Sequence, residues 1–138
     1  MSSFVYPSSI YNMFRSKINF NIDVFKVLLV SSKYIPDKNQ TSRFEIQGEV
    51  QNGNGYIRGG QEVNVAIVKD TQRNQIDVSL GKATWNNATI NANGAIYYRS
   101  TNQGPSNDDL ICFIEFENEA SSTNGTFIVT PSIIRLQL

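Results

Sequence analysis

The sequence predicts a mainly β chain, folded as a single antiparallel β-sandwich or jelly-roll-like domain with a short N-terminal helix. Two observations support this prediction. Apolar residues recur with a period of two along most of the chain, and clusters of turn-forming residues separate these runs at intervals of about 8–12 residues. The chain has 138 residues, which suffices for one domain with its own hydrophobic core.

Residues 1–20 are predicted to form an N-terminal arm that contains the helix, and residues 21–138 are predicted to form the β-sandwich domain. Pro7 suits the first turn of a helix because its φ angle is already helical. The residues after it follow a helical spacing, because apolar side chains recur every fourth position at Ile10, Phe14 and Ile18. We therefore expect a short helix over roughly residues 8–16.

Apolar runs predict the strands of the first half. Residues 25–30 are almost all apolar, which is typical of a strand covered on both faces. Residues 34–39 contain Pro, Asp and Asn and are expected to form an exposed loop. Strict alternation predicts further strands at 63–67 and 76–80, which a hairpin loop at 70–74 would join.

The second half contains longer predicted strands. Residues 88–100 have the pattern of one strand, in which Gly94 indicates a bulge or a close approach of another backbone. Residues 101–107 are predicted to be a loop, and Asn124-Gly125 is a strong turn signal. Two further strands are predicted from apolar residues that would share one face: Leu110, Cys112, Ile114 and Phe116 in the first, and Ile134, Leu136 and Leu138 in the second.

The charge balance bears on the class of partner. The chain carries 12 basic and 12 acidic residues, so its formal net charge is zero. Binding of nucleic acid needs clustered Lys and Arg in surplus, and a membrane span needs about 20 apolar residues in a row. We therefore expect neither nucleic acid nor a membrane as partner. The N-terminus also lacks the pattern of a signal peptide, so we expect synthesis in a cytoplasm.

The side chains that most enzymes use are scarce in this sequence. The chain has no histidine, which is the usual general base and the commonest zinc ligand. Cys112 is its one cysteine, and the apolar neighbours of that residue predict a small buried hydrophobe rather than a nucleophile. We expect a protein that is not an enzyme, with no catalytic residue, no metal site and no cofactor.

Carboxylates are the remaining candidates for chemistry. Asp108-Asp109 and the alternating Glu115, Glu117 and Glu119 could in principle form a glycosidase pair or a calcium site. The favoured interpretation of the three glutamates is a solvated outer face of a strand. An enzyme would require a reaction that depends on a carboxylate such as Asp109 or Glu115.

Aromatic residues allow a structural and a functional interpretation. Tyr97 and Tyr98 should face opposite sides of a sheet, so we expect core packing on one side and an interface contact on the other. Trp85 is expected to fill one end of the core. The alternative is a carbohydrate platform that uses Trp85, Tyr56 or Tyr98 to attach to a host.

The segment Gly55-Tyr56-Ile57-Arg58-Gly59-Gly60 has three glycines in six residues. Glycine permits positive φ angles and close approach of backbones, so the segment predicts a sharp turn before a strand. The alternative is a loop that lies flush against a neighbouring subunit.

Several motifs occur together in an order that resembles a known family. They are residues 26–37, the pair Glu49-Val50, the Gly-Tyr-x-x-Gly-Gly element at 55–60, the Trp-x-x-Ala-Thr-Ile element at 85–90, and residues 95–98, 110–116 and 124–127. They resemble a widespread family of small tailed-bacteriophage proteins that are encoded among virion structural genes. The resemblance covers about residues 8–138. The family usually opens with a helix and an Ile-Asp/Asn turn, of which residues 17–21 are a looser version.

The resemblance implies a virion component made in the host bacterial cytoplasm, and it supplies no catalytic residues. We expect a capsid cement or decoration protein that binds the major capsid protein and itself, as a homo-oligomer. A tail, neck or baseplate component is the alternative within the structural class, and a carbohydrate-binding host-attachment module is the alternative outside it. The residues expected to contact neighbouring subunits are Phe4, Tyr6, Tyr11, Phe14, Tyr34, Tyr56 and Arg58.

Overall fold

The computed structural model describes residues 3–138 and consists mainly of β-strands. The elements follow one another as β1 (Phe4–Val5), α1 (Pro7–Phe14), β2 (Val24–Val30), η1 (Arg43–Glu45), β3 (Gln61–Val63), β4 (Val65–Asp70), β5 (Gln75–Leu80), β6 (Ala83–Ser100), η2 (Pro105–Asn107), β7 (Asp109–Val129) and β8 (Ser132–Gln137). They form two antiparallel sheets, which confirms the predicted sandwich with a short N-terminal helix.

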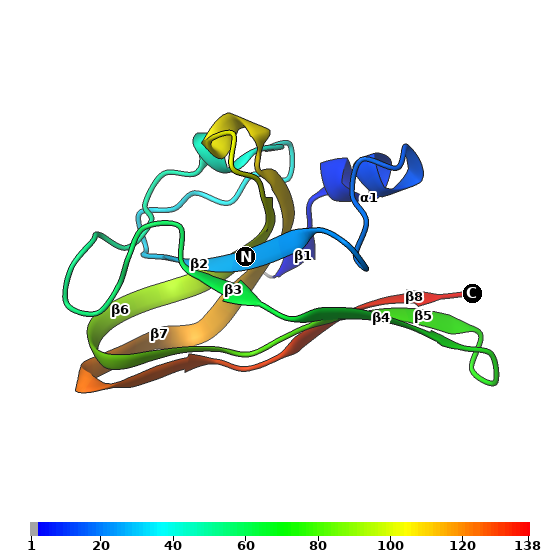
Figure 1. Ribbon diagram of the computed structural model, residues 1–138. Coiled ribbons are helices and arrows are strands. Elements are labelled where there is room, and N and C mark those ends of the chain that lie inside the picture. Colours follow the sequence, from blue (N-terminus) through cyan, green and yellow to red (C-terminus); the bar gives the residue numbers. More distant parts are fainter. Residues whose placement is uncertain (1–2) are drawn as a thin grey trace.

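The larger sheet has the strand order β1-β7-β6-β2-β3, and the smaller sheet has the order β4-β5-β8 (Figure 1). The long strands β6 and β7 of the larger sheet form a hairpin that pairs over most of its length. This hairpin is strongly curved, and its lower end leads into β5 and β8 of the smaller sheet (Figure 1). Asn64 separates β3 from β4, and at this residue the chain passes from the larger sheet to the smaller one. The predicted single strand at 63–67 is therefore two short strands in different sheets.

Hydrophobic cores cover both faces of the larger sheet. The core between the two sheets includes Val27, Trp85 and Leu80, which are each at most 2% exposed. The second core lies on the opposite face, where Tyr34 and Ile46 from the loop between β2 and β3 pack on the strands. This arrangement explains why nearly every residue of β2 is apolar, and it confirms the prediction of a strand covered on both faces.

The helix α1 begins at Pro7 and ends at Phe14, so it starts one residue earlier and ends two residues earlier than the predicted range of 8–16. The chain turns after it, where Ser16 has a φ of 64°. Ile18 and Phe20 then enter the core between the sheets, where the ring of Phe20 stacks on that of Phe25 at 5.3 Å.

Irregularities in the β6–β7 pairing correct two predictions. Asn124-Gly125 does not end a strand, because β7 runs from Asp109 to Val129 and Gly125 lies opposite Ala88. The positive φ of Asn124, 46°, is accommodated as an irregularity within the strand. An extra residue, Ile111, lies opposite the step from Tyr97 to Tyr98. Leu110 and Cys112 therefore enter different cores instead of sharing one face.

Gly94 lies where the pairing register shifts, as predicted. A Cβ atom at this position would lie 2.6 Å from the ring of Phe113 and 2.8 Å from the carbonyl oxygen of Ile114. The predicted close approach is confirmed, since only glycine leaves room for the neighbouring strand here.

The far ends of β4, β5 and β8 stand clear of the larger sheet, together with the C-terminus (Figure 1). We call these three strands and the turn at 71–74 the arm, and the rest of the chain the body. This arm is distinct from the N-terminal arm that was predicted for residues 1–20. The turn confirms the predicted hairpin loop between β4 and β5. Only the near end of the arm is covered, because Val78 and Leu80 enter the core while most of β4 stays exposed.

Candidate contact surfaces

Asp108 and Asp109 are structural side chains at the start of β7. Asp108 is 1% exposed and accepts hydrogen bonds from Nε of Arg43 at 2.8 Å and from the backbone N–H of Thr101 at 2.6 Å. Asp109 accepts from Nη2 of Arg99 at 2.6 Å and from Nζ of Lys17 at 3.0 Å. Each carboxylate is thus neutralised by cations from other segments, and the two together join η1, β6 and the segment after α1.

Glu115, Glu117 and Glu119 lie on the exposed side of β7, in agreement with the predicted solvated face. Within residues 3–138, no group of three or more His, Cys, Asp or Glu side chains is arranged to hold a metal ion.

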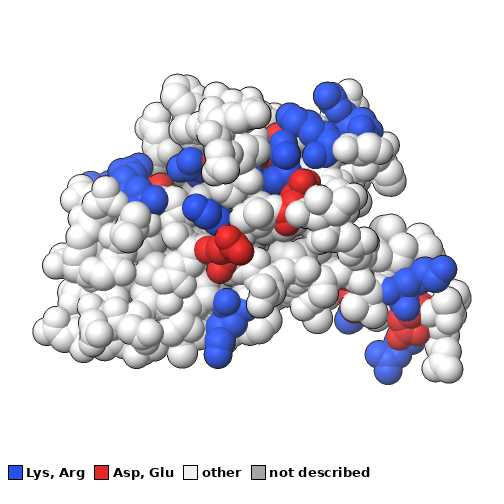
Figure 2. Space-filling view, viewed as in Figure 1, with Lys and Arg blue, Asp and Glu red and all other residues white. Residues whose placement is uncertain are grey.

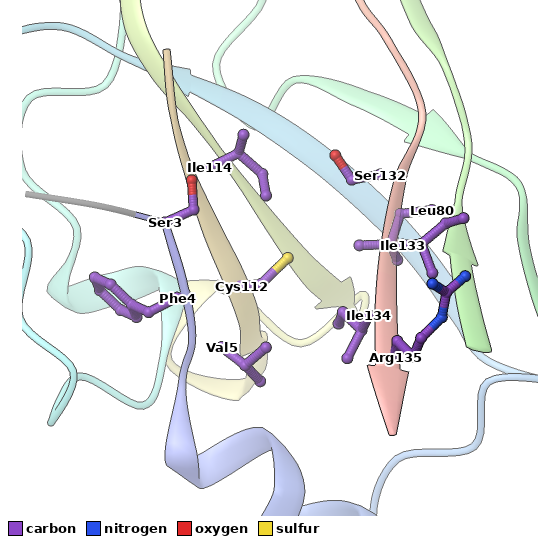
Figure 3. Close-up of a pocket in the computed structure, with 10 residues that line it drawn as sticks. All are labelled: Ser3, Phe4, Val5, Leu80, Cys112, Ile114, Ser132, Ile133, Ile134 and Arg135. Carbon is purple, nitrogen blue, oxygen red and sulfur yellow. The ribbon is translucent and has the colours of Figure 1, made fainter. Parts of the chain in front are cut away.

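Cys112 lies against a cavity of about 250 Å³ between β1 and β8 (Figure 3). Ser3, Phe4 and Val5 line one side, and Ser132 to Arg135 line the other. The thiol is 2% exposed, and burial raises its pKa to about 12. Cys112 therefore stays protonated at neutral pH and acts as a small hydrophobe, as the sequence predicts.

The glycine-rich segment 55–60 forms a tight turn. Gly55, Gly59 and Gly60 all have positive φ angles, and a Cβ atom on Gly60 would lie 1.8 Å from the carbonyl oxygen of Val27. The Tyr56 hydroxyl donates to Glu49 at 2.7 Å and accepts from the backbone N–H of Leu29 at 3.0 Å. Burial raises the pKa of Tyr56. These contacts fix the turn against β2, which supports the structural interpretation of this motif.

Tyr6 and Tyr34 belong to the second core. The Tyr6 hydroxyl donates to the Tyr34 hydroxyl at 2.7 Å, because Tyr34 donates its own proton to Gln40. Phe4 is half-buried and packs edge-on against Tyr6, with ring centroids 5.0 Å apart. Burial, followed by the bond to Tyr34, raises the pKa of Tyr6. These aromatic side chains hold the N-terminal segment on the sheet.

The seven predicted contact residues therefore have different environments. The structure leaves Tyr11, Phe14 and Arg58 exposed and buries Tyr6, Tyr34 and Tyr56 within the chain, with Phe4 between these extremes. Tyr11 and Phe14 lie three residues apart on the outer side of α1, and they are 64% and 80% exposed. We call these two residues the helix surface.

Trp85, Tyr97 and Tyr98 are core residues. Trp85 is 2% exposed and packs against Tyr56 and Phe127, with ring centroids 5.9 and 6.1 Å apart, so it fills the core as predicted. Tyr97 and Tyr98 face opposite sides of the sheet, but both are buried, which corrects the expectation of an interface contact on one side. Trp85, Tyr56 and Tyr98 are therefore not presented as a surface platform for a sugar ring.

The arm carries exposed apolar side chains that the sequence analysis did not anticipate. Its exposed large apolar side chains are Ile67, Val68, Ile133 and Leu136, and the exposed Leu138 follows β8 directly. Alternation identified the strands themselves, but alternation does not say whether the apolar face of a strand is covered. The signal available in the sequence was the lack of charge in 63–68, which is unusual for a strand that ends at a sheet edge.

The view in Figure 2 shows positive and negative side chains interspersed, with broad areas that carry neither. This agrees with the zero net charge and the low charged fraction of 17%. The connection between β2 and β3 adds three exposed apolar side chains, which are Ile35, Ile57 and, within η1, Phe44.

Among the described residues, no helix is long and apolar enough to cross a membrane. No protein-family model, curated protein or solved structure matches the chain.

Proposed function

We propose that this chain is a non-enzymatic structural protein of a bacteriophage virion, namely a capsid cement protein that binds the major capsid protein. The proposal starts from the resemblance of the ordered motifs to small tailed-phage proteins. The observation that carries it further is the exposure of large apolar side chains on α1, on the arm and on the loops of a weakly charged chain. Exposed apolar patches commonly mark surfaces that other proteins cover.

The helix surface is the leading contact for the shell. The side chain of Phe14 is 80% exposed. Burial of this ring against a partner would stabilise the complex by about 2–3 kcal/mol. A ridge made of Tyr11 and Phe14 is suited to an apolar groove on a partner, because aromatic residues dominate the energetic centres of protein interfaces. The Arg15 guanidinium lies 5.3 Å above the Tyr11 ring and supplies a cation at the edge of this ridge.

Such a protein would stabilise a shell by mass action. Binding to the assembled shell but not to free subunits lowers the free energy of the assembled form. Many copies on a symmetric lattice would add avidity, so each individual contact can be weak.

Counting copies of the chain in purified virions, by quantitative mass spectrometry against the major capsid protein, tests the proposal. A cement protein is expected on the order of hundreds of copies, in simple ratio to the shell subunit. About six or twelve copies would instead indicate a ring in the tail, neck or baseplate. Absence from the particle would overturn the assignment to the virion.

A matched pair of variants tests the helix surface. Phe14→Ser should weaken binding to empty shells on the order of tenfold or more, because it removes one exposed aromatic anchor without disturbing the core. Ile128→Ser removes an exposed side chain from β7 and serves as the control, with shell binding close to wild type. Equal affinities for both variants, measured by cosedimentation with shells, would exclude the helix surface as the contact.

A further inference from the structure

The outer edge of β4 is a strand edge that carries little protection. Within the described part of the chain β4 pairs with β5 on one side, and it stands at the end of the order β4-β5-β8. Ala66, Ile67, Val68 and Lys69 are all exposed. Unpaired N–H and C=O groups at such an edge can pair with another strand, and proteins usually prevent this with charges, proline or bulges. Between residues 65 and 68 the chain has none of these.

The other strand edges are short, face another strand, or are interrupted by charges and register shifts. β1 has two residues and β3 has three. The first half of β8 faces β1 across the cavity shown in Figure 3. The outer sides of β6 before Gly94 and of β7 beyond Glu115 also lie outside the ladders with β2 and β1. Register shifts interrupt that part of the β6–β7 hairpin, and β7 carries Glu117 and Glu119 there. β4 is therefore a regular outer edge that carries no charge from Val65 to Val68.

The sequence of β4 is complementary to itself in the antiparallel direction. A two-fold axis through Ile67 would place Ile67 opposite its own copy, Ala66 opposite Val68 and Val65 opposite Lys69. Each residue would then oppose one from the same face of the sheet, as antiparallel pairing requires. No like charges would meet, since Lys69 would face an aliphatic residue, whereas an axis through Lys69 would bring two ammonium groups together.

We propose that β4 pairs with β4 of a second copy of this chain, antiparallel and with Ile67 at the two-fold axis. The two arms would then form one continuous sheet in the order β8-β5-β4-β4-β5-β8. Ile67, Ile76 and Leu136 share one face of each arm, so pairing would join two apolar stripes into one wider surface. This inference does not depend on the proposed function, because it concerns the chain by itself.

The contact is expected to be weak in dilute solution. One pair of six-residue edges buries well below the roughly 800 Å² per partner that is typical of stable complexes. Dimers should therefore form at high protein concentration, or where copies are already held next to one another.

A cysteine placed on the axis tests both the edge and its register. Directly opposed residues in antiparallel strands have Cα atoms about 4.5–5.5 Å apart, within the range that a disulfide can bridge. Ile67→Cys should form an intermolecular disulfide rapidly under mild oxidation, while native Cys112 stays unreactive because it is buried. Ile133→Cys on β8 is the control, since Ile133 is more exposed than Ile67 yet lies on the other edge of the arm. Equal rates of cross-linking for the two variants would overturn the proposal.

Charge substitutions at the same position provide a test that does not rely on cross-linking. Ile67→Lys and Ile67→Asp should each remain monomeric at the concentration where the wild type dimerises, because like charges would meet at the axis. An equimolar mixture of the two variants should dimerise again, which sedimentation equilibrium would detect. A wild type that stays monomeric at millimolar concentration, or a mixture that stays monomeric, would refute self-pairing and leave the edge for a strand of another protein.

Discussion

The body and the arm are both built from alternating β-strand sequence, but they are stabilised to different degrees. In the body, β2 and the adjoining parts of β6 and β7 are buried on both faces by two cores. In the arm, Val78 and Leu80 enter the core, whereas Ile67 and Leu136 remain 42% and 51% exposed. Alternating apolar residues therefore form a buried core where other side chains cover the strand, as in the body. Where no such layer covers the strand, as in most of the arm, the same alternation leaves apolar side chains exposed.

The largest expected difference between the two regions concerns the loss of an apolar side chain. Trp85→Ala should lower the free energy of unfolding by about 3–5 kcal/mol, because it removes a buried ring packed against Tyr56 and Phe127. Leu136→Ala in the arm should cost less than about 1 kcal/mol, since half of that side chain is already exposed. Urea unfolding of both variants measures the contrast, and similar losses would show that the arm contributes to stability as the body does.

The next effect concerns the glycine turn of the body. Gly60→Ala should destabilise by about 3 kcal/mol or more, because its φ is 77° and the new Cβ would collide with the Val27 carbonyl oxygen. Gly53→Ala is the matched control, with a φ of 112° but no atom within 4 Å of the new Cβ. That control should cost only about 1 kcal/mol from backbone strain. Thermal unfolding measures the stability of both variants. If both lose the same stability, the turn can move away from β2 with little loss of free energy.

A smaller effect is expected at the buried carboxylate of the body. Asp108→Asn should lower the free energy of unfolding by about 2 kcal/mol, because it leaves the Arg43 guanidinium without its anionic partner. In the arm, Asp77→Asn should lower it by less, since Arg135 is largely exposed to solvent. Urea titrations at pH 7 compare the two variants. A larger loss at Asp77 would contradict the view that burial determines the strength of these pairs.

The smallest effect is the acid dependence of the arm. Hydrogen bonds from Arg135 hold the pKa of Asp77 below its usual range. The unfolded chain therefore takes up a proton at this residue first as the pH falls. The pair of Asp77 and Arg135 contributes fully to the free energy of unfolding above about pH 4, the pKa of an aspartate in the unfolded chain. This contribution disappears as the pH falls through the lower pKa that Asp77 has in the folded protein. Wild type and Asp77→Asn should then converge in stability once the pH lies below the folded pKa of Asp77, as urea unfolding at a series of acidic pH values would show. A difference that persists there would mean that Asp77 acts by a route other than its charge.

Local pattern predicted much of the fold. The helix at Pro7, the buried strand around Leu28, the turn at 71–74 and the close approach at Gly94 each depend on chemistry within a few residues. The break at Asn64 could not be predicted in this way, because it depends on which sheet supplies the neighbouring strand. The Asn124-Gly125 error has a related cause, since a positive φ suits a bulge as well as a hairpin.

The contact residues were harder to predict than the fold. A tyrosine in a loop has the same sequence signature whether it points inward or outward, so Tyr34 and Tyr56 were grouped with Tyr11. Their burial depends on partners far along the chain, such as Phe113 for Tyr34 and Trp85 for Tyr56. Exposure of the arm likewise depends on the absence of a covering layer among the described residues, which only the tertiary arrangement reveals.

The pairing of β1 with β7 determines when β1 can fold during synthesis of the chain. Phe4 lies opposite Phe113, and Val5 lies opposite Cys112. β1 can therefore pair only after the chain has been synthesised as far as Phe113. Because long-range pairing of this kind slows folding, Phe4 and the residues beside it remain open to chaperones or to neighbouring chains until β7 has formed.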